Sequence, residues 1–178
     1  MQLLKESEVL DLLGGDKMDI DGKVRESVTT DSKYVMDVVN ALVEEHTDEL
    51  DKMVERIHED LRQDVTFTDE QLSKMVLEMN TLLYNIIDPN LGIDIREEIS
   101  HMKQKSDYAL ARQTASGTVA DKDNEAWLAT QDISVLNLIY KESNKLMKSK
   151  LDRASELLLS LKKILTFRIQ QMSGMSDQ

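Results

Sequence analysis

The fold of this chain is set near its C-terminus by the segment Ile133–Met172, ISVLNLIYKESNKLMKSKLDRASELLLSLKKILTFRIQQM. Large apolar residues recur there at spacings of three and four residues, which is the 3.5-residue period of a helix that packs lengthwise against another helix. Neither Gly nor Pro occurs between Gly117 and Gly174, so nothing in that stretch forces a break. We name the positions that follow this period the seam: Ile133, Leu136, Tyr140, Asn144, Met147, Leu151, Ala154, Leu158, Leu161, Leu165, Arg168 and Met172.

The seam predicts extensive helix packing and self-association. A helix of roughly 40 residues is about 60 Å long, so other helices or a second copy of the chain must cover it. Apolar residues beside the seam favour a bundle of three or more helices, from one chain or several. Asn at a seam position can fix the register and the number of helices. We predict a homo-oligomer joined through Leu136, Tyr140, Asn144, Met147, Leu151, Leu158, Leu161 and Leu165.

The composition favours an all-α class, a helical bundle with a long C-terminal coiled-coil-like helix. One Pro and six Gly in 178 residues leave few tight turns for a sheet. The chain has no Cys, which excludes disulfides and thiolate chemistry and fits a reducing compartment. It contains no apolar run of about 18 residues and no secretory signal pattern, so we expect a cytoplasmic protein without membrane contact.

Start and stop signals divide the chain into four parts. The N-terminal part is acidic and contains a leucine-rich helix that ends at Gly14 and Gly15. The second part contains helices separated at the cap Thr68 and at the turn 88–92. The predicted parts are 1–30, an acidic arm with a short amphipathic helix; 31–115, a three-helix region with helices over 31–63, 68–86 and 94–114; 116–123, a loop; and 124–172, a long basic helix.

The second of these helices has a clear N-terminal signal. Thr68 is a capping residue type, and Gln71 stands three residues later, which is the capping-box pattern. Phe67 and Leu72 have the spacing of a hydrophobic staple across the same cap. We therefore predict that a helix begins directly after Thr68.

The residues that usually carry catalysis or hold metals show no recognisable pattern. His46, His58 and His101 are not spaced three or four residues apart, and no His-Glu-x-x-His motif is present. Glycine-rich phosphate loops and dinucleotide fingerprints are also absent. We expect a protein that is not an enzyme, and we assign no catalytic residue, metal or cofactor.

The charge is divided unevenly along the chain. Residues 1–70 carry 20 acidic against 8 basic side chains (−12), residues 71–132 carry 10 against 6 (−4), and residues 133–178 carry 4 against 8 (+4). A basic helix suits a phosphate backbone, although it can equally be a solvated face that meets the acidic helix 31–63 of the same or a neighbouring chain. The candidate nucleic-acid contacts are Lys103, Lys105, Arg112, Lys141, Lys145, Lys148, Lys162, Lys163 and Arg168.

The C-terminal two-thirds of the chain resembles a known family. A basic helical segment, Lys103–Arg112 (KQKSDYALAR), precedes a break at Ser116–Gly117, and the long final helix closes on Leu158–Ile169 (LLSLKKILTFRI). Over residues 67–172 this order resembles the UvsY-type recombination mediators of tailed phages. The resemblance implies a non-enzymatic, ring-forming protein that binds single-stranded DNA and helps load a recombinase by displacing the single-strand-binding protein. It implies DNA contacts at Lys103, Lys105, Arg112, Lys162, Lys163 and Arg168.

Two other functions stay open from the sequence. Residues 1–64 are acidic and can occupy a basic surface on a host protein, as a phage-encoded inhibitor, adaptor or DNA mimic, or the arm can fold back on its own bundle. Self-association also suits a virion scaffold or assembly protein. The expected partners are a second copy of the chain, single-stranded DNA with a recombinase or single-strand-binding protein, or a host protein in the host cytoplasm.

Overall fold

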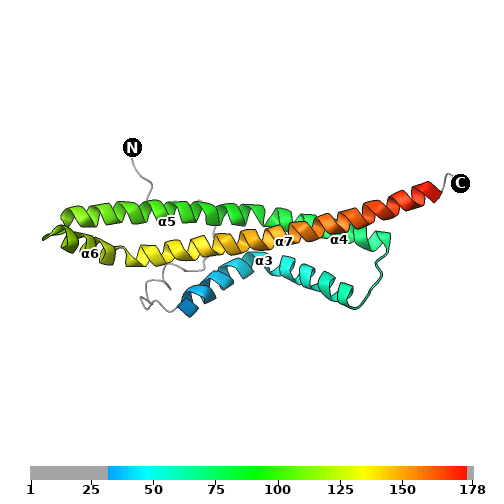
Figure 1. Ribbon diagram of the computed structural model, residues 1–178, viewed down its shortest axis with the longest axis horizontal. Coiled ribbons are helices and arrows are strands. Elements are labelled where there is room, and N and C mark those ends of the chain that lie inside the picture. Colours follow the sequence, from blue (N-terminus) through cyan, green and yellow to red (C-terminus); the bar gives the residue numbers. More distant parts are fainter. Residues whose placement is uncertain (1–31, 176–178) are drawn as a thin grey trace. The chain divides into compact units, whose positions relative to one another are not determined.

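The computed structural model describes residues 32–175. This part of the chain contains five helices (Figure 1). None of these residues lies in a strand, so the predicted all-α class with a long C-terminal helix is confirmed. The helix predicted within residues 1–30 lies outside the described range. The helices are α3 (Ser32–Arg62), α4 (Asp69–Asn85), α5 (Ile87–Thr114), α6 (Val119–Ala129) and α7 (Gln131–Met175).

The helices form two compact units. The described residues of the first unit are 32–39 and 92–142, and those of the second unit are 40–91 and 143–175. The first unit therefore contains most of α5, all of α6 and the start of α7. The second unit contains most of α3, all of α4 and the remainder of α7.

The core of the second unit is apolar and uses the seam. Leu158 and Leu161 of α7 lie in one buried cluster with Met53 and Ile57 of α3 and with Phe67, Leu72 and Met79, which belong to α4 and its N-terminal flank. The seam is thus covered here by helices of its own chain, and its burial does not require a second copy. Self-association through the seam stays a prediction.

A ladder of partly buried polar side chains joins α5 to α7 in the first unit. Gln104 Nε2 of α5 donates to Ser134 Oγ of α7 at 2.7 Å, and Asn137 Nδ2 of α7 donates back to Gln104 Oε1 at 3.1 Å. Ser100 Oγ lies 3.2 Å from Asn137 Oδ1 and extends this ladder by one turn. Buried polar groups need partners, so the ladder favours one register of α5 against α7.

Capping explains where α4 and α6 begin. Thr68 caps α4, and its capping box with Gln71 is present as predicted. Phe67 and Leu72 are both buried in the second-unit cluster, which agrees with the predicted staple. A second capping box, between Thr118 and Asp121, begins α6. Val119 therefore starts a helix inside the segment 116–123, for which the sequence suggested a loop.

The structure differs from the sequence expectation at two helix boundaries. Ile86 alone separates α4 from α5, and Pro89 lies in the first turn of α5, where a helix does not need a backbone N–H donor. Pro89 thus allows α5 to begin at Ile87 and to run through the segment 88–92, where a turn was expected. At Thr130 the chain breaks between α6 and α7: its backbone N–H donates to Trp127 O, three residues back, and its Oγ1 donates to Ala126 O at 3.0 Å. The long helix consequently starts at Gln131 rather than near residue 124.

We expect Asp64→Gly to stabilise the protein by up to about 1 kcal/mol. Asp64 follows α3 with φ of 52°, and Val65 N–H donates to Asp60 O while Asp64 N–H donates to Leu61 O. These two bonds form a Schellman motif, whose left-handed position favours glycine. Denaturant unfolding of both proteins would measure the gain. The control Asp60→Gly, inside α3, should lower stability, and equal effects of both changes would contradict the argument.

We expect the Thr118→Val variant to raise the pKa of Asp121 toward its ordinary range. The side-chain hydrogen bond from Thr118 and then its backbone hydrogen bond hold the pKa of Asp121 below that range. A lowered carboxyl pKa stabilises the fold above the pKa of the unfolded chain, and that stabilisation is lost as pH falls through the folded value. Carboxyl-carbon NMR titration measures the shift, and an unchanged titration of Asp121 would refute it.

Candidate nucleic-acid interface

The nine candidate contacts lie in both units, so the structure assembles them as two groups. Four of them belong to the first unit and five to the second. The exposed members in the first unit include Lys105 and Lys141, whereas Lys103 is half-buried. In the second unit Lys145, Lys148, Lys162 and Lys163 are exposed and all lie on α7.

Arg112 is engaged inside the first unit. Its Nε lies 2.5 Å from Asp123 Oδ1, an oxygen that also accepts a hydrogen bond from the Tyr108 hydroxyl at 3.3 Å. The pair joins the end of α5 to α6, on either side of the Gly117 turn. Arg112 therefore has an architectural role, and only part of its guanidinium is left for a ligand.

Arg168 is engaged inside the second unit. Its Nη1 donates to Phe67 O at 2.5 Å and lies 3.4 Å from Asp69 Oδ1. Both partners flank the cap Thr68, so the guanidinium ties the end of α7 to the start of α4. The polar interruption of the seam at this position is explained by that contact.

Lys150 is the cation whose role the sequence did not reveal. Its Nζ donates to Asp51 Oδ2 at 2.5 Å and to Thr47 Oγ1 at 3.0 Å, and its side chain is only 22% exposed. Thr47 is buried and its hydroxyl also lies 3.0 Å from Val43 O. This network joins α3 to α7, since a partly buried charge requires partners. The basic helix does meet acidic α3 at this point, as one of the open interpretations expected.

The end of α7 carries basic side chains and no acidic ones. Residues 159–172 contain three basic side chains and no acidic one, a net charge of +3. Lys163 is exposed, and Lys162 is exposed with its Nζ 3.3 Å from Asn80 Oδ1. Phe167 is 60% exposed and lies four residues after Lys163, on the same side of the helix. We name residues 159–172 the cationic end of α7.

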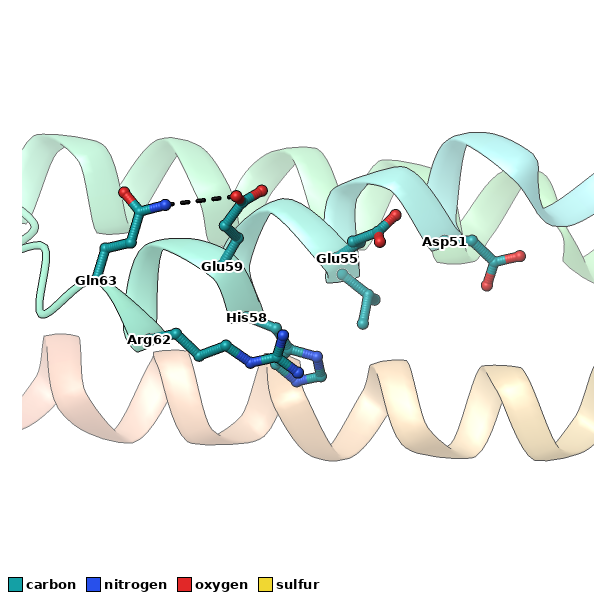
Figure 2. Close-up of a pocket in the computed structure, with 7 residues that line it drawn as sticks. Asp51, Glu55, His58, Glu59, Arg62 and Gln63 are labelled. Carbon is teal, nitrogen blue, oxygen red and sulfur yellow. Dashed lines mark hydrogen bonds between the residues drawn. The ribbon is translucent and has the colours of Figure 1, made fainter.

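A groove of about 650 Å³ lies along α3 in the second unit (Figure 2). Gln63 Nε2 lies 3.4 Å from Glu59 Oε1 on its rim, and the His58 and Arg62 side chains extend toward the facing helix (Figure 2). All of its lining residues come from α3 and the residue after it, and none of them has a hydroxyl or thiol side chain. Its lining residues are Asp51, Val54, Glu55, His58, Glu59, Arg62 and Gln63.

Within residues 32–175, no three His, Asp or Glu side chains are placed to share a metal ion. Over the same residues, no helix combines the length and apolar character needed to cross a membrane. Comparisons of the chain with protein families, with curated proteins and with solved structures found no match.

Proposed function

We propose that this chain is a non-enzymatic binding protein whose cationic end of α7 engages single-stranded DNA. The observation that supports this most strongly is the combination at residues 159–172 of net charge +3, exposed Lys162 and Lys163, and exposed Phe167. Proteins that hold single strands combine cations along the phosphate backbone with aromatic rings on which bases stack. A single helix here offers both.

The spacing along α7 fits such a ligand. Leu159, Lys163 and Phe167 follow one another at four-residue intervals, so they form a ridge along one side of the helix. All three are exposed, whereas Leu158 and Leu161 point into the second-unit core. A phosphate at Lys163 leaves an unstacked base within reach of the Phe167 ring.

The further role as a phage-type recombination mediator rests on the resemblance of residues 67–172 to that family. In this role the protein self-associates, so the cationic ends of several copies act on one strand and raise the effective affinity. It then helps a recombinase to replace a single-strand-binding protein. Light scattering of the purified protein tests the self-association, and a monomer at all concentrations would remove this part of the proposal.

We expect the double variant Lys162→Glu/Lys163→Glu to lower the affinity for a single-stranded oligonucleotide at least tenfold. Each lost phosphate contact also reduces the slope of log affinity against log salt by about 0.7 for a single strand, so the slope should fall by roughly 1.4. Fluorescence anisotropy over a salt series measures both quantities. The matched control Lys52→Glu/Lys74→Glu changes the net charge equally at exposed sites on α3 and α4 and should retain most of the affinity. No binding by the unaltered protein at low salt would refute the proposal.

We expect Phe167→Ala to weaken DNA binding by about 1–3 kcal/mol, the usual contribution of one stacked base, without changing the salt slope. The side chain is exposed, so its removal should leave the unfolding transition unchanged. Anisotropy and denaturant unfolding measure the two effects. Leu159→Ala, one turn further from the C-terminus on the same ridge and also exposed, is the apolar control. Equal losses in both variants would show that stacking is not involved.

A second candidate function is supported by the surface of α3. Within the second unit, six acidic side chains of this helix are exposed, and three acidic residues line its groove (Figure 2). Such a surface suits a basic protein partner, as expected of an acidic adaptor or DNA mimic. Reversing acidic charges on α3 would abolish that interaction, whereas Lys162→Glu/Lys163→Glu would leave it intact. The exposed acids are Glu44, Glu45, Asp48, Glu49, Glu55 and Glu59.

A further inference from the structure

An apolar surface lies at the end of α7, where the seam continues past the helices that cover it. Leu161 is buried and Leu165 is half-buried, but Ile169 and Met172 are 53% and 55% exposed. In Figure 1 the last turns of α7, coloured red, extend beyond the loop that joins α3 to α4. Leu165, Ile169 and Met172 are spaced by four and three residues and so share one side of the helix. We name these three residues the terminal apolar face.

We propose that the leucine-rich N-terminal segment, residues 1–13, docks on the terminal apolar face. A helix of this length is marginal in water by itself, and it gains stability by placing its apolar side against an existing apolar surface. The chain thus contains a leucine-rich segment and an apolar face that is about half exposed. The apolar side chains of the segment are Leu3, Leu4, Val9, Leu10, Leu12 and Leu13.

Charge complementarity favours the N-terminal segment, and not a second copy of the same helix end, as the occupant of the terminal apolar face. Residues 1–31 contain eight acidic and four basic side chains, a net charge of −4, against +3 for residues 159–172. Two copies of the cationic end would instead bring +3 against +3, which opposes their pairing. Lys162, one helical turn before Leu165, is exposed and available to the acidic segment.

Charge also selects this face over the exposed apolar residues of α4 and the start of α5. Leu77, Tyr84, Ile87 and Leu91 are all more than half exposed on α4 and the start of α5. They lie within residues 69–91, which contain four acidic side chains and one basic side chain, a net charge of −3. An acidic segment is repelled there and attracted to the end of α7.

The connecting chain is long enough for docking. Residues 14–31 provide 18 residues, including three glycines, and this length spans up to about 60 Å when extended. The segment can therefore reach the face on its own chain or on a neighbour. Docking beside Lys162 and Lys163 would also compete with DNA, and only this consequence rests on the proposed function.

The docking is tested directly in the full-length chain, which has no native Cys and accepts a single spin label. With the label at Gln171→Cys, we expect strong paramagnetic broadening of the amide NMR signals of residues 3–13. A label at Ser155→Cys lies 16 residues earlier on α7, about 24 Å away, and should leave those signals sharp. Sharp signals with both labels would overturn the proposal. Mixing labelled and isotope-enriched chains distinguishes docking within one chain from docking on a neighbour, and either result supports it.

The docking is also tested by substituting residues of the terminal apolar face and measuring the same broadening. Ile169→Ser/Met172→Ser should abolish the broadening, whereas Leu77→Ser/Leu91→Ser, at equally exposed apolar sites, should preserve it. If Leu77→Ser/Leu91→Ser reduced the broadening as much as Ile169→Ser/Met172→Ser does, the proposal would be overturned. In DNA titrations the Ile169→Ser/Met172→Ser variant should bind several-fold more tightly, and unchanged affinity would overturn the competition alone. Broadening without any DNA binding would leave docking established and the proposed function refuted.

Discussion

The burial of Leu158 and Leu161 of α7 against α3 and α4 is the interaction on which the second unit depends. These leucines share one cluster with Met53, Ile57 and Met79, so three helices bury their apolar sides together. Each such side chain contributes on the order of 1.5–3 kcal/mol when it leaves water. The staple residues Phe67 and Leu72 join the same cluster and thereby tie the capped start of α4 to the core.

Apolar packing alone leaves the register of long helices poorly specified, and polar contacts supply it here. In the second unit, Lys150 bonds Asp51 and Thr47 across α3 and α7, and Arg168 bonds Phe67 O at the start of α4. In the first unit, the ladder through Gln104 and Asn137 performs the same task between α5 and α7. A slip of either helix would leave buried polar groups without partners, at a cost of about 1–3 kcal/mol each.

Basic side chains that form internal contacts are less available to bind a ligand. Cations that look equivalent along the sequence are divided between internal contacts and exposed positions. Lys150, Arg112 and Arg168 stabilise the architecture, whereas Lys145, Lys148, Lys162 and Lys163 are exposed. The proposed binding surface is the part of α7 where exposed cations lie beside Phe167 and no acidic side chain occurs. The same helix end carries the terminal apolar face, so a ligand and the N-terminal segment would meet at one place.

The sequence by itself determined the helical class, the limits of α3, the capped start of α4 and the long seam of α7. These features depend on residues within a few turns of each other, as with Thr68 and Gln71, so local rules suffice. Only the tertiary structure decided that Arg168 pairs with Phe67 and Lys150 with Asp51, because those partners lie about 100 residues apart in the chain. It also decided which part of the seam is covered, since coverage depends on where α3 and α4 end and not on the period of α7.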